Sequence, residues 1–226
     1  NRKNNPIDLE GARQAIYLDF EGPGRPSGGE APPPMFAGTL IEGQYAFWVL
    51  DPVFQGLAES KEIPFASLDG FLAMTLQIAQ LHSRRVVFWS SHEETIFSEG
   101  GYAPDGIGFD LKIPAKEVHE ARFNEFRKTE QRWKNPKTPK TTKTKLKSKA
   151  FGLLTLLAAD LGLPRPKGYG PGLVGKWIST MREQAVSKTH YEKWATSGKA
   201  AATKLRNHNK HDCEATEFLL KQLLGA

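Results

Sequence analysis

The sequence of 226 residues contains a single cysteine, Cys213. One cysteine excludes an intramolecular disulfide framework and a zinc site built from several thiolates. Such sparse use of cysteine is typical of a reducing compartment, so we expect a cytoplasmic protein. The N-terminal segment NRKNNPIDLE has no apolar stretch, which predicts no signal peptide. Because the chain does not begin with Met, we expect it to be a piece of a longer protein.

Long hydrophobic runs are also missing. The most apolar segment, FGLLTLLAADLGL at residues 151–163, is shorter than the roughly 20 residues that span a bilayer. It also contains Asp160, so we expect no membrane association. The Gly-rich segments GPGRP and GYGPG lack the Lys–Ser/Thr ending of a phosphate-binding P-loop. No residue lies in a recognisable setting for a covalent nucleophile, which argues against acyl-enzyme chemistry.

Positive charge is present in excess and unevenly spread. The net charge is +6, and residues 122–149 carry eleven Lys or Arg against two Glu. The segment KNPKTPKTTKTKLKSK at 134–149 is made of residues that build no core, which predicts a disordered basic insertion. Such a segment attracts phosphate backbones without reading sequence. We expect nucleic-acid contacts from Lys137, Lys140, Lys143, Lys145 and Lys147.

The order of apolar patterns predicts one α/β domain over residues 1–226, with a mixed sheet, flanking helices and a helical C-terminal half. Its first half is expected to begin with a strand at 14–20 and a β-hairpin of 35–42 and 44–51. A helix at 66–83, a central parallel strand within 84–91 and a helix at 92–99 are expected to follow. Ser90 or Ser91 is expected to cap the helix at 92–99. Its second half shows helical patterns at 115–133, 149–162, 177–185, 190–198 and about 199–224.

Two carboxylates interrupt the first strand, AIYLDFEG. Asp19 and Glu21 lie one residue apart and therefore point to the same side of an otherwise buried strand, where they repel each other. In the last helix, the apolar stripe followed backwards reaches Asp212 and His208, which share a face because they are four residues apart. Asp212 is then either a polar residue at the stripe edge or a partner of Asp19 and Glu21 across the sheet.

Three converging carboxylates need cations to neutralise them. Mg²⁺ or Mn²⁺ suits this task because these hard ions prefer oxygen ligands. Two such ions about 4 Å apart can clamp the attacking and leaving oxygens of a phosphodiester. We therefore expect two metal ions held by Asp19, Glu21 and Asp212.

These segments carry a family resemblance. YLDFEG near the start and HNKHDCEAT near the end resemble the first and last motifs of the ribonuclease H-like DEDD 3′–5′ exonucleases. The likeness is greatest to an RNase H-like nuclease domain that accompanies RecB-type nucleases and helicases. VVFWSSHEETIF, and GYGPGLVGKW followed by HYEKW, resemble the segments between those motifs, so the likeness covers roughly residues 14–224.

The resemblance implies a ribonuclease H-like fold and metal-dependent hydrolysis of single-stranded nucleic acid from its 3′ end. It also implies that the domain can be part of a larger nuclease or helicase polypeptide. Asp19, Glu21 and Asp212 would bind the metals, and Glu93 would be the remaining acid, where an aspartate is usual. His208 takes the position of a tyrosine that orients or deprotonates the attacking water. Neutral imidazole is a competent base near pH 7, and we expect the nearby carboxylates to raise the pKa of His208 and bound cations to lower it again.

Several alternatives stay open. The residues at Glu93 and His208 depart from the family pattern, which is compatible with a degenerate nucleic-acid-binding or scaffold domain, and the acids do not exclude an endonuclease. Asp110 is an alternative acid, although its Gly neighbours favour a turn. His211 points about 100° from Asp212 and is expected at the surface. His92 is expected to cap a helix. Two aromatic residues beside the glycines are candidates for stacking on bases, namely Tyr169 and Trp177.

Deleting residues 137–147 should weaken nucleic-acid binding and flatten its salt dependence, because fewer phosphate counterions are then released. Turnover at saturating substrate should change little, since the deletion leaves the acids in place. Equilibrium binding of a labelled oligonucleotide over a series of salt concentrations measures the slope. An unchanged slope would reduce this segment to a passive linker.

Overall fold

The computed structural model describes residues 6–24, 32–102, 104, 106–125, 153–166, 168 and 172–226. In this part of the chain one mixed sheet has the strand order β3-β2-β1-β4-β5. β1 pairs antiparallel with β2 and parallel with β4, and β5 continues the parallel side. The strands are β1 (Ile16–Glu21), β2 (Phe36–Ile41), β3 (Gln44–Val49), β4 (Val86–Phe88) and β5 (Gly108–Asp110).

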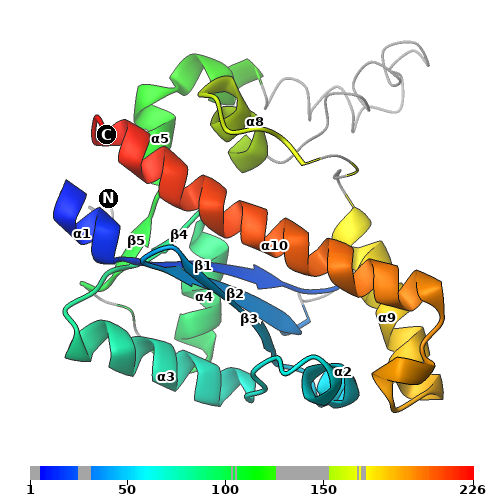
Figure 1. Cartoon of the computed structure of the whole chain (residues 1–226). Helices are drawn as coiled ribbons and strands as arrows, with labels where there is room; N and C mark the ends of the chain where they lie inside the picture. The colour runs from blue at the N-terminus through cyan, green and yellow to red at the C-terminus, as the bar shows by residue number, and fades with distance from the viewer. Residues whose placement is uncertain are drawn as a thin grey trace, which may run out of the picture.

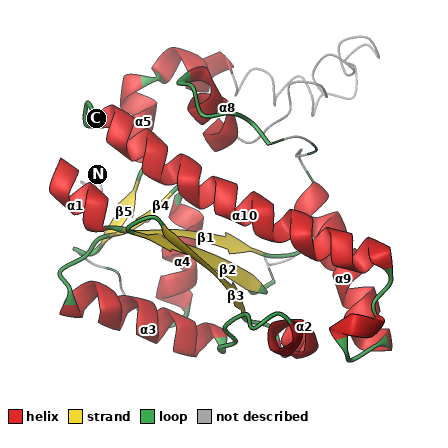
Figure 2. Cartoon of the chain, in the orientation of Figure 1, coloured by secondary structure: helices red, strands yellow, loops and turns green. Residues whose placement is uncertain are grey.

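Helices cover both faces of this sheet, which makes the fold α/β with three layers (Figures 1 and 2). The long helix α10 crosses one face, with α9 and α8 packed against it, and α3 and α4 lie on the opposite side of the sheet. The helices are α1 (Leu9–Gln14), α2 (Gln55–Ser60), α3 (Leu68–Leu81), α4 (Ser91–Glu99), α5 (Lys112–Val118), α8 (Leu153–Asp160), α9 (Leu173–Ser187) and α10 (Thr196–Leu223), with short 3₁₀ turns η1 (Pro52–Phe54) and η2 (Tyr191–Lys193).

The hairpin between β2 and β3 follows from its two turn residues. Ile41 pairs with Gln44, so the loop contains only Glu42 and Gly43. Both have positive φ, 49° and 77°, as a type I′ turn requires. Gly43 adopts this conformation without steric cost, and the predicted hairpin is confirmed.

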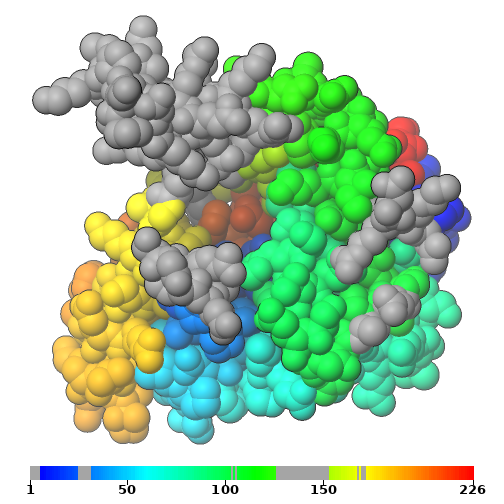
Figure 3. Space-filling view, turned by 180° about the vertical axis from the view of Figure 1, so that it is seen from behind, coloured from blue at the N-terminus to red at the C-terminus, as the bar shows by residue number. Residues whose placement is uncertain are grey.

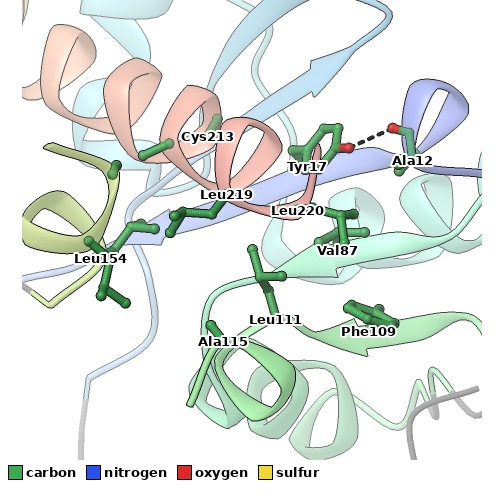
Figure 4. Packing of buried hydrophobic residues seen from close by; sticks show 14 of the residues in the cluster. Ala12, Tyr17, Val87, Phe109, Leu111, Ala115, Leu154, Cys213, Leu219 and Leu220 are labelled. Carbon is green, nitrogen blue, oxygen red and sulfur yellow. Dashed lines mark hydrogen bonds between the residues drawn. The ribbon is translucent and has the colours of Figure 1, made fainter. Parts of the chain in front are cut away.

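β1 is buried on both faces, and its alternation decides where its acids point. Ile16, Leu18 and Phe20 pack in the cluster that includes α3 and α4. Tyr17 packs instead with Leu219 and Leu220 of α10 (Figure 4). Since side chains alternate along a strand, the next two odd-numbered residues lie on the α10 side of the sheet. These residues are the two carboxylates predicted to form a site.

Most of the predicted elements are confirmed, with a few exceptions. The strand within 84–91 is central and parallel as expected, and Ser90 caps α4. Helices α1 and α2 and strand β5 were not predicted. Residues 190–198 are mainly η2 and an extended link, because Trp194 and Ala195 have β conformation, so a helix there is wrong. The basic segment 134–149 lies outside the described residues.

No helix in the described ranges combines the length and the apolar character needed to cross a membrane.

Replacing Leu219 by Ala should lower the free energy of unfolding by about 2–5 kcal/mol, because Leu219 is fully buried between α10 and the sheet. The matched control is Leu81→Ala, since Leu81 is also a helical leucine but is 75% exposed. Denaturant unfolding of both variants measures the difference. Equal stabilities would contradict the placement of α10 on the sheet.

Candidate functional site

The predicted site residues meet where α10 passes over the carboxyl end of β1. His208 Nε2 lies 3.6 Å from Asp212 Oδ2 and 4.0 Å from Glu21 Oε1. The side chains keep limited access to solvent, with 8% of Glu21, 18% of Asp212 and 20% of His208 exposed. Figure 3 shows a hollow between the yellow α9 segment and the green part of the chain, with orange-red atoms of α10 at its floor.

The four acids influence one another. Burial raises the pKa of Asp19 well above its usual value, and the charges of Glu21, Asp212 and Glu93 raise it further. The pKa of Glu21 is also raised well above its usual range by burial, and then by Asp212 and Glu93. Burial, followed by the charge of Glu93, raises the pKa of Asp212 to about 7. The structure therefore brings all four predicted acids into one electrostatic cluster.

Glu93 has a structural role as well. Its Oε2 accepts hydrogen bonds from the backbone N–H and the hydroxyl of Ser90, which completes a capping box at the start of α4. Burial nevertheless raises the pKa of Glu93 to about 7, because it outweighs these hydrogen bonds. The Glu93 side chain is long enough to reach back to Ser90 in this capping box.

His208 is neutral near pH 7, as its expected role requires. Burial, followed by the charge of His211, lowers the pKa of His208 to about 4. The expectation that the carboxylates raise this pKa is wrong, because desolvation of the imidazolium dominates. The Trp177 ring meets the imidazole edge-on at a centroid distance of 6.0 Å, which contributes to that burial.

Two carboxylate oxygens in the cluster are left unsatisfied. Glu21 Oε1 and Asp212 Oδ1 are buried and accept no hydrogen bond from the described residues. An unsatisfied buried polar atom is destabilising unless a ligand, ion or water contacts it. The donor chemistry, oxygen atoms of clustered acids, suits a hard divalent cation. Even so, the described residues contain no group of three or more His, Cys, Asp or Glu that could hold a metal ion as the side chains stand.

Other expected contributors are placed differently. Trp177 is buried beside His208, so little of its ring is available to a base. His211 is buried rather than at the surface, because α10 is covered by α8 and α9 as well as by the sheet. His92 is exposed, and the capping side chain is that of Ser90. The remaining candidates lie outside the described residues: Lys137, Lys140, Lys143, Lys145, Lys147 and Tyr169.

Asp110 was interpreted from the sequence as an alternative acid or as a turn carboxylate, and the structure agrees with both. It ends β5, and its Oδ1 accepts a hydrogen bond from the Lys112 N–H, as a turn carboxylate does. Its charge also raises the pKa of Glu93 after burial has done so, because β5 ends beside β4. Asp110 is therefore a fifth acid at the edge of the cluster.

Sequence reasoning missed Asn209, which hydrogen-bonds Asp19 from α10. Asn209 is four residues after Leu205 and three before Asp212, so it belongs to the buried stripe of the helix. A polar residue at that spacing was the signal that could have found it.

Comparison with protein-family models, with curated proteins and with solved structures finds no match to this chain. The functional argument therefore depends on the chemistry of the cluster.

The raised pKa values predict a pH-dependent stability. Between about pH 4 and pH 7 the four acids hold protons in the folded protein that they release in the unfolded chain. His208 and His211, whose pKa values are lowered, act in the opposite sense, but the acids outnumber them, so stability should fall as the pH rises through this window. Glu21→Gln removes one of the repelling charges and should raise the free energy of unfolding at pH 8 by about 1–2 kcal/mol. At pH 4, where the cluster is protonated, it should have little effect.

Denaturant unfolding at both pH values measures this difference. The control is Glu117→Gln, the same chemical change at an exposed position of α5. A Glu21→Gln variant whose stability differs from wild type equally at pH 4 and pH 8 would contradict the charge repulsion.

Proposed function

We propose that this protein is a metal-dependent nuclease with a ribonuclease H-like domain that removes nucleotides from the 3′ end of a single strand. The observation that carries the proposal is the cluster of four acids beside a neutral histidine, gathered from β1, α4 and α10, in which Glu21 and Glu93 are buried and Asp19 and Asp212 are partly buried. The mixed sheet with helices on both faces agrees with this class of domain in its general form. A fold alone does not define an activity, so the cluster is the main argument.

Asp19, Glu21 and Asp212 are the residues that would hold Mg²⁺ or Mn²⁺, with Glu93 as the remaining acid. The unsatisfied oxygens of Glu21 and Asp212 support this assignment, because a cation would satisfy both. Small side-chain rotations are needed, since the present arrangement is no complete ligand set among the described residues. When bound, the ions would supply Lewis acidity for activating water and for neutralising the departing 3′ oxygen.

His208 supplies the proton acceptor in this proposal. Its neutral imidazole can take a proton from the attacking water at Nε2, the atom that faces the carboxylates. Asp212, at 3.6 Å, stabilises the imidazolium that results. Trp177 packs edge-on against the ring and limits the orientations that it can adopt.

A non-catalytic nucleic-acid-binding domain is the second candidate. Two observations favour it: Glu93 is engaged in a capping box, and the described residues hold no finished metal group. In that case the acids would share protons instead of binding ions. Cleavage assays separate the two candidates.

The proposal is tested with single strands of DNA and RNA labelled at the 5′ or the 3′ end, incubated with and without Mn²⁺. We expect cation-dependent shortening of 5′-labelled strands from the 3′ end. Asp19→Asn should abolish it while the protein stays folded, because one ligand charge is lost. His208→Ala should lower turnover about 10²–10⁴-fold, the usual effect of removing a positioned base. His208→Tyr should keep more activity than His208→Ala.

His82→Ala, at an exposed position after α3, is the matched control and should cleave like wild type. Internal cuts in an end-blocked or circular strand would assign an endonuclease instead. Binding without any cleavage would favour the second candidate, and undiminished cleavage by Asp19→Asn would sink the metal assignment.

A further inference from the structure

A buried amide connects the first strand of the sheet to the last helix. Asn209 is fully buried, and its Nδ2 donates to the carboxylate Oδ2 of Asp19 at 2.7 Å and to the main-chain oxygen of Asp19 at 3.1 Å. Asp19 Oδ1 accepts no hydrogen bond from the described residues. One oxygen of this carboxylate is therefore fixed, and the other is left for a different partner.

The orientation of the Asn209 amide is determined by its contact with the main-chain oxygen of Asp19. The Tyr45 hydroxyl donates to Asn209 Oδ1 at 2.8 Å. On the other side, the main-chain oxygen of Asp19 can only accept, so the NH₂ group of the amide must face it. A flipped amide would place its oxygen against two acceptors. Asn209 thus presents a donor to Asp19 in a single arrangement.

The position of the amide also depends on the absence of a side chain at Gly38. Gly38 lies opposite Asp19 in the pairing of β1 with β2. A Cβ at this position would lie 1.6 Å from Asn209 Oδ1 and 3.1 Å from a ring carbon of Tyr45. A distance of 1.6 Å is far shorter than van der Waals contact, so the amide can occupy this space only because residue 38 is a glycine.

We propose that Asn209 is a positioning residue that holds Asp19 Oδ2 through its amide and thereby leaves Asp19 Oδ1 to a divalent cation, with Tyr45 and Gly38 fixing the amide in place. This inference rests on the proposed function, because it needs a cation among the acids. Without the amide, the Asp19 side chain could rotate, and its oxygens would meet the cation in several geometries. Partners that orient a ligand in this way typically change metal affinity 10–100-fold when removed.

The test measures Mn²⁺ binding to the whole chain by titration calorimetry, without nucleic acid. Asn209→Ala should weaken binding about 10–100-fold. The matched control is Asn207→Ala, the same substitution on the exposed face of α10, which should bind like wild type. Asp19→Asn, which removes a ligand, should weaken binding at least as much as Asn209→Ala.

Gly38→Ala tests the same amide from the opposite strand. Its methyl group displaces Asn209, so this variant should lose as much affinity as Asn209→Ala. The double variant Gly38→Ala/Asn209→Ala should be more thermally stable than Gly38→Ala, because the clash is gone, yet should bind Mn²⁺ no better. Tyr45→Phe keeps the amide but frees its oxygen, and should lose affinity to a smaller degree.

The outcomes separate this inference from the function. If Asn209→Ala is folded and binds Mn²⁺ like wild type while Asp19→Asn does not, the positioning role is overturned and the metal site stands. If Asn209→Ala fails to fold, the other variants decide. Wild-type affinity for Mn²⁺ in Tyr45→Phe and in the double variant would then overturn the positioning role of Asn209. If wild type binds no Mn²⁺, the inference and the proposed function both fail.

Discussion

Helix α10 can lie this close to the sheet beside the cluster of acids only because β2 has no side chain at Gly38. The amide of Asn209 fills that space and is satisfied by Tyr45 on one side and Asp19 on the other. This contact sets the height of the helix above β1. The distances from His208 to Glu21 and Asp212 follow from it, since His208 and Asp212 lie within one turn of Asn209 along α10 and Glu21 lies on β1 below.

Around that contact lie ionisable groups, the acids and His208, whose charged forms are unfavourable between hydrophobic layers. Burial and mutual repulsion both favour the protonated forms of the acids, whereas burial favours the neutral form of His208. Both shifts therefore reduce net charge in the cluster when no cation is present. In the proposed function, a cation would offset the repulsion, and the same groups would then serve as anionic ligands and a proton acceptor. The burial of the large apolar clusters on both faces of the sheet stabilises the fold and so offsets the cost of placing these acids close together.

The sequence was sufficient to predict the α/β class, the hairpin and the acids of the site, because each depends on local spacing. Alternation in β1 located Asp19 and Glu21, and the helical stripe located Asp212. The burial of His211 could not be predicted in this way, since it depends on neighbours that contact α10 from several directions. Strand β5 was missed because it is short and gains its stability from pairing with β4 rather than from its own residues. The nuclease assignment remains a prediction.

The hydrogen bond between Asn209 and Asp19 joins residues 190 positions apart in the chain. During synthesis, β1 leaves the ribosome long before α10 exists, so a growing chain carries Asp19 and Glu21 without the residues that orient them. Contacts of such long sequence separation form late and slowly in folding. The cluster of acids is therefore completed only when the last helix docks, and a chain truncated before α10 would have all five described strands but would lack Asp212 and His208.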